Sequence, residues 1–235
     1  NDGSEIAKSR IENNLPTGLL GINIGPNKDT SDMTSDFLKC ANIFFPLGDY
    51  LTINISSPNT KGLRDFHKEE NLNNLLTKIN QIRKESNFNK SFLLKISPDL
   101  EDSFIDSIIG LSIKHNINGL ILTNTTDSNR ENLIDKKKNE NGGLSGKPIQ
   151  NLSTNLIKKF YKQLKGKIPI IGVGGIDSGE SAFEKISSGA SAVQLYTGMI
   201  FKGPTIVKDI KSGLINILKD KGFKNINEAV GTNLN

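Results

Sequence analysis

The sequence predicts an α/β fold built from consecutive βα units, because short apolar runs alternate with amphipathic stretches along the chain. Each apolar run is nearly continuous in Leu, Ile and Val, as in parallel strands that are covered on both faces. The expected strands are Gly18–Ile24, Tyr50–Ile55, Phe92–Ile96, Gly119–Thr123, Ile168–Val173 and Ala192–Tyr196. The expected helices are 35–45, 69–85, 101–115, 152–165, 179–188 and 204–220, preceded by a helix at 2–14. Strict alternation of this kind makes a parallel sheet, either doubly wound or closed into a barrel.

The residues that follow the expected strands favour the barrel. Every strand ends in polar residues or glycine: Asn23 and Gly25, Asn54–Asn59, Lys95, Thr123–Thr126, Gly172–Gly175 and Tyr196–Gly198. A doubly wound sheet concentrates its site at one switch point, whereas a (β/α)8 TIM barrel draws site residues from the ends of most strands. Six units are two fewer than a closed barrel needs. We therefore expect one domain, residues 1–235, holding the last six βα units, with two units upstream and residues 2–14 as the helix that ends the second.

Composition excludes several classes of protein. The net charge is +5, but the lysines are interspersed with acids and there is no Trp. The sequence therefore has no basic stripe with interleaved aromatic residues, and we do not expect it to bind nucleic acid. The one cysteine, Cys40, lies in an expected helix and is interpreted as a structural thiol. We expect His67 to be solvated in a charged loop and His115 to cap a helix, so no zinc site is expected. The sequence has no apolar run of about 18 residues that could span a membrane.

The segment Asn54-Ile-Ser-Ser-Pro-Asn59 places two carboxamides and two hydroxyls directly after an apolar run. A strand core does not hold so many hydrogen-bonding side chains, because each would need a partner. Pro58 stops the strand, so the cluster must turn outward at its carboxyl end. The segment predicts a site for a small polar ligand, with a possible catalytic hydroxyl.

Glycines on two consecutive strand ends indicate a phosphate site. The run Ile170-Ile-Gly-Val-Gly-Gly-Ile176 is followed one unit later by Gln194-Leu-Tyr-Thr-Gly198. Glycine lets backbone N–H groups approach a phosphate closely, and many barrels bind phosphate after strands 7 and 8. The first run lacks the third glycine of the dinucleotide fingerprint.

Three further features have a structural and a functional interpretation. Lys95 ends an apolar strand and is either a residue at the rim that reaches solvent or a buried cation that faces an anionic ligand; we favour the second. The run Thr123–Thr126 could be a capped turn or could present three side chains to a ligand. The charged loop Asp127–Asn141, which precedes Gly142-Gly-Leu-Ser-Gly146, is long enough to be a lid.

Seven motifs in order resemble dihydroorotate dehydrogenase, a family of FMN-dependent (β/α)8 barrels of pyrimidine synthesis. They are Gly21-Ile-Asn-Ile-Gly25, Asn54-Ile-Ser-Ser-Pro-Asn-Thr-Lys-Gly-Leu-Arg64, Lys95-Ile-Ser-Pro-Asp99, Thr123-Asn-Thr-Thr126, Gly142-Gly-Leu-Ser-Gly-Lys-Pro148, Gly172-Val-Gly-Gly-Ile-Asp177 and Gln194-Leu-Tyr-Thr-Gly198. Serine at position 57 resembles class 2, the membrane-associated, quinone-reducing branch. The soluble class 1 branch carries a cysteine there.

The resemblance assigns roles to individual residues. FMN contacts are implied for Asn23, Asn54, Lys95, Thr123, Gly146, Gly175, Tyr196 and Thr197. Contacts with the dihydroorotate or orotate ring and carboxylate are implied for Asn54, Asn59, Asn124 and Thr125. Tyr196-Thr197 departs slightly from the commoner Tyr-Ser. The first strands of the family and its helical pair that docks on the membrane have no counterpart in this sequence.

The same resemblance implies a mechanism in which Ser57 takes a proton from dihydroorotate while a hydride passes to FMN. A serine hydroxyl is a weak base and no histidine lies close in sequence to activate it. A relay through water and a neighbouring hydroxyl is therefore implied, with Thr60 as its candidate. Lys95 is expected near the N1/O2 edge of the flavin.

The implied localisation is peripheral, on the mitochondrial inner membrane or the cytoplasmic face of a bacterial inner membrane, with a quinone as partner. Two alternatives remain open. One is a class 1-like flavin barrel dehydrogenase with a soluble acceptor, against which Ser57 argues. The other is an inactive remnant, because a barrel without two strands exposes unpaired strand edges.

Overall fold

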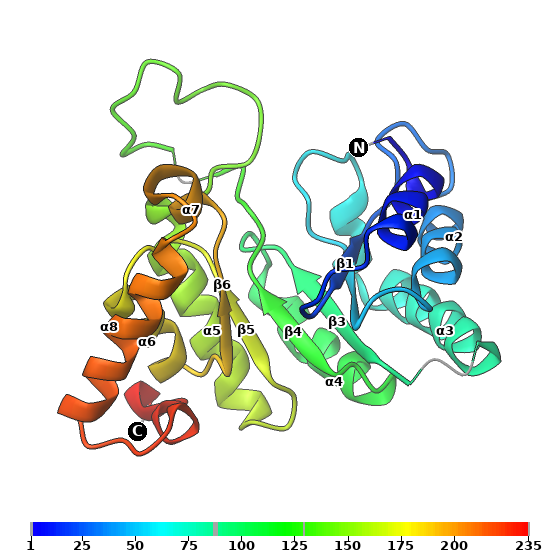
Figure 1. Ribbon diagram of the computed structural model, residues 1–235. Coiled ribbons are helices and arrows are strands. Elements are labelled where there is room, and N and C mark those ends of the chain that lie inside the picture. The colour runs from blue at the N-terminus through cyan, green and yellow to red at the C-terminus, as the bar shows by residue number, and fades with distance from the viewer. Residues whose placement is uncertain (1, 87–88, 129, 235) are drawn as a thin grey trace.

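The computed structural model describes residues 2–86, 89–128 and 130–234. Its described residues form one six-stranded sheet in the order β1-β2-β3-β4-β5-β6, and every neighbouring pair is parallel. Figure 1 shows the strands curving around a common axis, with helices on the outer side. The strands are β1 Gly21–Ile24, β2 Tyr50–Asn54, β3 Ser91–Ile96, β4 Gly119–Leu122, β5 Ile170–Val173 and β6 Ala192–Gln194.

Helices connect successive strands, as the alternation predicts. The α-helices are α1 Ser4–Asn13, α2 Met33–Phe44, α3 Glu69–Glu85, α4 Ile105–Lys114, α5 Gln150–Leu164, α6 Gly179–Ser187, α7 Thr197–Lys202 and α8 Ile206–Asp220. Short 3-10 turns are η1 Leu63–His67, η2 Asp102–Phe104, η3 Lys147–Ile149, η4 Ile226–Ala229 and η5 Thr232–Leu234. All six predicted strands and the seven predicted helices are confirmed, with shifted ends, whereas the sequence analysis missed α7.

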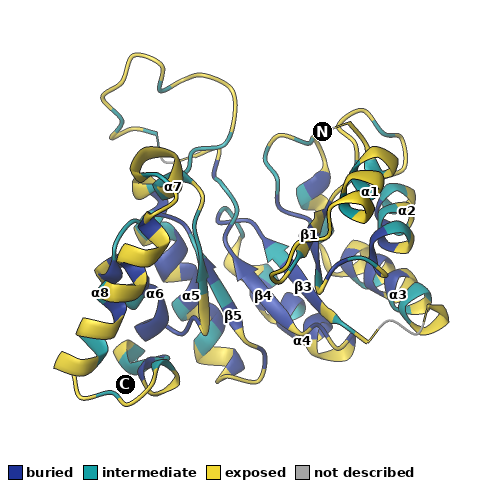
Figure 2. Cartoon of the chain, in the orientation of Figure 1, coloured by how far each residue is buried: buried dark blue, intermediate teal, exposed yellow. Residues whose placement is uncertain are grey.

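The core lies between the sheet and the helices that cover its outer face. In α3 the buried residues Leu72, Leu75, Leu76 and Ile79 recur at helical spacing and make one apolar stripe. The middle strands are buried on both faces; all four residues of β4 are buried. The edge strands differ: β1 alternates exposed and buried residues, and β6 is partly exposed along its length. Figure 2 shows the same gradient, with buried residues concentrated in β3, β4 and the inner sides of the helices.

The expectation of a partial (β/α)8 barrel is confirmed. Parallel order, sequential strand pairing and a helix after each strand are the features of such a barrel. Within the described residues, β1 and β6 are the two edges of the sheet and do not pair with each other. Carboxyl ends of parallel strands meet at one rim, so the six strand-end segments predicted as functional share that rim.

Strand register fixes which side chains point to the inner face. Asn23 is aligned with Thr52, and Asn54 is aligned with Lys95. Lys95 in turn is aligned with Ile121. Because residues two apart on a strand share a face, Asn23, Asn54 and Lys95 all lie on one face.

The loop between β4 and α5 is the longest connection in the fold and projects from this rim (Figure 1). Its base is closed by an antiparallel bridge between Thr126 and Leu144. Asn129, within the predicted lid Asp127–Asn141, lies outside the described residues.

The expectation that His67 is solvated is wrong. The turn η1 points its ring inward, and only 5% of the residue is exposed. Burial, with a smaller effect from the Arg64 charge, lowers the pKa of His67 to about 4, so the ring is neutral at pH 7. Its Nε2 accepts a long hydrogen bond, 3.5 Å, from the backbone N–H of Ser97. His115 is the C-cap residue of α4, as expected, and Cys40 lies half-buried in α2.

Candidate functional site

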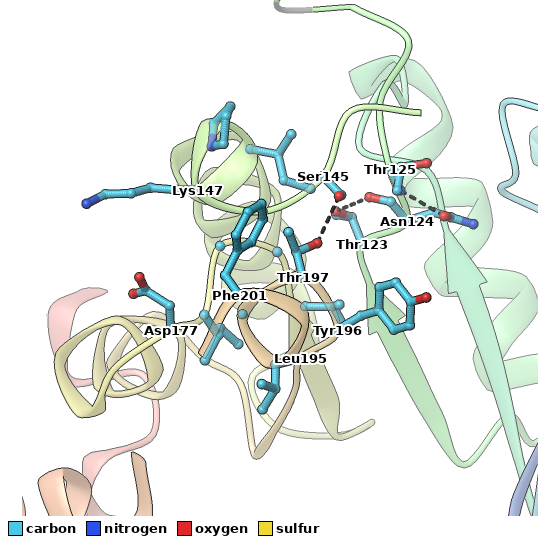
Figure 3. Close-up of a pocket in the computed structure, with 18 of the residues that line it drawn as sticks. Thr123, Asn124, Thr125, Ser145, Lys147, Asp177, Leu195, Tyr196, Thr197 and Phe201 are labelled. Atoms are coloured by element: carbon cyan, nitrogen blue, oxygen red, sulfur yellow. Dashed lines mark hydrogen bonds between the residues drawn. The ribbon is translucent and has the colours of Figure 1, made fainter. Parts of the chain in front are cut away.

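A cavity of about 570 Å³ opens at the carboxyl ends of β3 to β6. This volume is within the range of about 300–1,000 Å³ typical of small-molecule sites. Eight of the residues predicted as functional line it: Lys95, Thr123, Asn124, Thr125, Gly146, Gly175, Tyr196 and Thr197. Figure 3 shows Thr123, Ser145 and Thr197 converging from three different segments.

One end of the cavity is a cradle of backbone N–H groups after β5 and β6. The N–H groups of Gly174, Gly175, Thr197 and Gly198 donate no hydrogen bond to any residue that the structure describes. Gly174 and Gly175 are buried and have φ of 121° and 76°, which L side chains rarely adopt. A Cβ on Gly175 would lie 2.5 Å from the Cβ of Gln150, at the start of α5. The cradle therefore requires glycine, and its donors suit an anion.

The helix α7 completes this cradle and was not predicted. It begins at Thr197, directly after the predicted strand residue Tyr196, and its first residues, Thr197 and Gly198, line the cavity together with the β5 loop. The hydroxyl of Thr197 donates to Ser145 Oγ at 2.8 Å, which ties α7 to the Gly142–Gly146 segment (Figure 3). A short extra helix after strand 8 is a recurrent part of barrel phosphate sites.

Lys95 enters the cavity from β3 without a partner in the described part of the chain. The residue is half-buried, and no carboxylate or carbonyl oxygen accepts its ammonium protons there. Burial lowers the pKa of Lys95 because desolvation disfavours the charged form. An unpaired cation of this kind is stabilised by an anionic ligand.

A network of two carboxamides and one hydroxyl adjoins the cavity. Asn54 Oδ1 accepts from Ser56 N at 3.2 Å, Ser56 Oγ at 2.8 Å and Asn124 Nδ2 at 3.1 Å. Asn124 Nδ2 also donates to Ser56 Oγ at 3.0 Å, and Asn124 Oδ1 accepts from Thr125 N at 2.8 Å. These bonds use both amide donors of Asn124, whereas the amide donors of Asn54 have no partner in the part of the chain that the structure describes.

The remaining predicted residues do not line the cavity. Ser57 is half-buried, and its Oγ accepts from Asn59 N at 3.2 Å. Asn59 is exposed and lines a separate surface pocket under the lid. No hydrogen bond joins Thr60 to Ser57 among the described residues, and Asn23 on β1 is exposed. The structure therefore joins Asn54 to the cavity residue Asn124, and it leaves Ser57, Asn59, Thr60 and Asn23 outside the cavity lining.

Several residues that line the cavity were missed as individual site residues. Ser145 and Gly174 stand inside motifs already identified, so the motif itself was the available signal. Asp177, Lys202 and Phe201 come from α7 and the β5 loop; Lys202 Nζ pairs with Asp177 Oδ2 at 3.2 Å. Among the described residues no group of three or more His, Cys, Asp or Glu side chains could hold a metal ion, and no helix is long and apolar enough to cross a bilayer.

A parallel half-barrel with its cavity, anion cradle and lid at the carboxyl ends of the strands places the protein in the (β/α)-barrel class with a strand-end site. The comparisons narrow that class. The family model described as "Dihydroorotate dehydrogenase" matches residues 1–218. The chain belongs to the dihydroorotate dehydrogenase family.

Individual relatives agree with this assignment. The mouse protein named dihydroorotate dehydrogenase (quinone), mitochondrial, is 44% identical over 229 residues, covering 96% of this chain and 58% of the relative. A dihydroorotate dehydrogenase (quinone) of Bradyrhizobium sp. strain ORS 278 is 38% identical over 237 residues, covering 98% and 65%. The crystal structure of the Eimeria tenella enzyme with ferulenol superposes with a TM-score of 0.88 at 34% identity, covering 98% and 66%. The chain spans about three fifths of the length of these two sequence relatives.

Proposed function

We propose that the protein oxidises dihydroorotate to orotate, with FMN as hydride acceptor and a quinone as final electron acceptor, in pyrimidine biosynthesis. The observation that carries this proposal is one cavity that combines an anion cradle with a desolvated lysine and adjoins the Asn54–Ser56–Asn124 network. Family membership and the relatives' names support the same reaction.

The donor set of the cavity fits FMN. The unpaired N–H groups of Gly174, Gly175, Thr197 and Gly198 suit its phosphate, which is anionic and accepts several hydrogen bonds. Lys95 suits the electron-rich edge of the flavin ring, and Thr123, Gly146 and Tyr196 would line the ring. FMN, when bound, supplies the acceptor for a hydride. Asn23 would contact FMN only from beyond the present cavity wall.

The substrate would lie next to the carboxamides and the serine. The amide donors of Asn54 have no partner among the described residues and would serve a carbonyl or carboxylate oxygen, with Asn124 and Thr125 beside them. Asn59 would reach the substrate from the neighbouring surface pocket. Ser57 would take the proton that leaves dihydroorotate, and Thr60 would pass it on through water. Assistance of this kind contributes about 10²–10⁴-fold to a rate. Lys95 would stabilise the negative charge that develops as the substrate is oxidised.

A quinone acceptor implies contact with a membrane, where quinones dissolve. We infer that the protein is peripheral on an inner membrane. Serine at position 57, rather than cysteine, and the word "quinone" in the relatives' names support this inference. Cell fractionation should find the protein in the membrane pellet and release it with detergent; recovery in the soluble fraction alone would contradict the inference.

The reaction is tested with protein expressed from its complete gene. The purified protein should show flavin absorbance, release FMN on denaturation, and reduce a soluble ubiquinone analogue in a dihydroorotate-dependent reaction. Turnover with fumarate or NAD⁺ but not with the quinone analogue would indicate the alternative class with a soluble acceptor. A protein that folds but binds no flavin and oxidises no dihydroorotate would contradict the proposal.

A further inference from the structure

An arginine outside the cavity links the loop of Ser57 to the loops on either side of it. Arg64 lies in η1, and the segment 55–62 that carries Ser57 runs directly into this turn. Leu63, its neighbour, is 1% exposed and holds η1 against the core. The end of the Ser57 segment is therefore anchored at Arg64.

The guanidinium of Arg64 bridges two carboxylates from two different strand-end loops. Its Nη2 lies 2.8 Å from Asp99 Oδ2, after β3, and its Nη1 lies 2.9 Å from Asp127 Oδ1, after β4. The hydrogen bond from Arg64 is the largest of the effects that lower the pKa of Asp127. Arginine presents its N–H groups in a rigid planar fork, so a lysine, which has a single flexible ammonium group, would not reproduce this two-pronged geometry.

Asp99 extends this link to the start of the lid. Its Oδ1 accepts from the hydroxyl of Thr126 and, at 2.9 Å, from that of Ser128, while its Oδ2 accepts from Asp127 N at 3.4 Å. These three donors are the residues at which the lid leaves the segment with Asn124 and Thr125. The carboxylate of Asp99 thus fixes the start of the lid on the same arginine that ends the Ser57 segment.

Gly143, just after the lid, contacts both the Asn124–Thr125 segment and the segment that carries Ser57. A Cβ on Gly143 would lie 1.9 Å from Thr125 Oγ1 and 3.1 Å from Pro58 Cγ, so the backbone of Gly143 is in close contact with both. Pro58 directly follows Ser57. Within the lid, the guanidinium of Arg130 donates to the carbonyls of Lys138 and Glu140, each at 2.9 Å, and to that of Gly142. The segment that carries Ser57 is therefore tied to one end of this loop through Arg64 and contacts the other end through Pro58.

We propose that Arg64 is a positioning residue for Ser57: its ion pairs with Asp99 and Asp127 hold the Ser57 segment in register with the Asn124–Thr125 segment and the base of the lid. This role rests on the proposed function. Arg64 and Asp99 keep 25% and 17% of their side chains exposed, and Asp127 keeps 59%. The pair with Asp127 is exposed on its carboxylate side and adds little to global stability. The pair with Asp99 is mostly buried, so the melting temperature is measured beside the rate to separate geometry at Ser57 from folding.

The test is a double-mutant cycle in protein expressed from its complete gene and loaded with FMN. Arg64→Gln and Arg64→Lys are made in the wild-type and in the Ser57→Ala background. Arg83→Gln is the matched control, because Arg83 lies on α3 over the ring of Phe92, at 5.5 Å from its centroid. FMN content, the melting temperature and the rate of flavin reduction by dihydroorotate without oxygen are measured for each variant.

We expect Arg64→Gln to keep its FMN and to slow flavin reduction roughly 10–100-fold, as for a small misplacement of a reacting group. Arg64→Lys should fall between Arg64→Gln and wild type, and Arg83→Gln should match wild type. In the Ser57→Ala background Arg64→Gln should cause no further loss, because Arg64 acts through Ser57. If Arg64→Gln does not fold, Asp127→Asn, at the exposed end of the network, takes its place in the cycle.

The outcomes separate this role from the proposed function. An equal loss from Arg64→Gln in both backgrounds, or a loss of FMN, would overturn the positioning role and leave the base assignment intact. Undiminished flavin reduction in Ser57→Ala alone would overturn the base assignment, and the role of Arg64 with it. A loss of rate from Arg64→Gln in the wild-type background that is absent in the Ser57→Ala background supports the positioning role of Arg64.

Discussion

At the scale of single residues, Lys95 supplies a positive charge in the cavity that we expect to stabilise the charge developing in the reaction. It is a half-buried cation of the cavity without a partner among the described residues, and the register places it beside Asn54. We expect Lys95→Met to slow flavin reduction roughly 10²–10³-fold, the usual cost of removing one group that stabilises developing charge. Lys159→Met is the control, because Lys159 pairs with Asp102 on the surface. Stopped-flow absorbance checks this, and equal rates in the two variants would contradict the role of Lys95.

His67 makes a prediction about stability and pH. Its pKa of about 4 in the folded protein lies below the ordinary value of 6.5, mainly because of burial. Between these values the unfolded chain binds more protons, so the free energy of unfolding should fall as pH drops from about 6.5 to 4. The loss should be on the order of 3 kcal/mol.

His67→Gln keeps an acceptor for Ser97 N but does not titrate. Urea unfolding at several pH values, comparing wild type with His67→Gln, isolates the contribution of this group. Below pH 6.5 the free energy of unfolding of wild type should fall relative to that of His67→Gln. Parallel curves from pH 7 to pH 4 would show that His67 titrates normally in the folded protein.

A local sequence pattern can predict the position of a residue only where its neighbours in sequence determine that position. The positions of Asn54 and Ser57 at the end of β2, and of Lys95 near the end of β3, could be predicted because polar residues that close an apolar run lie at the strand end. The burial of His67 could not, because it depends on η1 turning toward Ser97, thirty positions away in sequence. The Arg64 bridge likewise joins three loops that come together only in the folded barrel.

At the scale of elements, the glycine cradle after β5 shows how backbone geometry makes a ligand site. Gly175 has φ 76° and no room for a Cβ beside Gln150, so Gly175→Ala adds strain and a clash at once. Strain of about 1–3 kcal/mol at this loop should weaken FMN binding roughly tenfold or more. Fluorescence titration of the apoprotein with FMN measures it.

A control substitution at another glycine separates the effect of backbone strain from the effect of damage to the FMN site. Gly222, after α8, has a similar φ of 77°, and nothing lies within 4 Å of the position that a Cβ would take there. Gly222→Ala should therefore carry the backbone strain but leave the FMN dissociation constant unchanged. Equal weakening in both variants would mean that the cradle after β5 does not bind the cofactor.

The elements themselves could be predicted to different degrees. The six strands could be predicted from their nearly continuous apolar runs, and helices such as α3, α5 and α8 could be predicted from the apolar stripe that each buries. The helix α7 was missed because its six residues, Thr197–Lys202, include Met199, Ile200 and Phe201, which are exposed and show no buried stripe. Its position depends on the Thr197–Ser145 contact and on the β5 loop, which no local pattern reports.

At the scale of the whole molecule, the cavity is assembled from four consecutive strand ends, from β3 to β6, and from α7. A ligand that touches all of these should stabilise the fold. Removing FMN should lower the melting temperature by roughly 5–10 °C, the shift expected from a ligand at about 100 times its dissociation constant. Differential scanning fluorimetry of the apoprotein with and without added FMN checks this, with riboflavin as the control that lacks the phosphate. An equal shift with riboflavin would contradict the phosphate cradle.

The central claim is that this site oxidises dihydroorotate with Ser57 as the base. The most direct measurement is the bleaching of bound FMN after mixing with dihydroorotate without oxygen, in wild type and in Ser57→Ala. We predict rapid bleaching in wild type, and bleaching about 10²–10⁴-fold slower in Ser57→Ala with FMN still bound. Bleaching at the wild-type rate in Ser57→Ala would contradict the role of Ser57, and an FMN spectrum that dihydroorotate leaves unchanged in wild type would contradict the reaction itself.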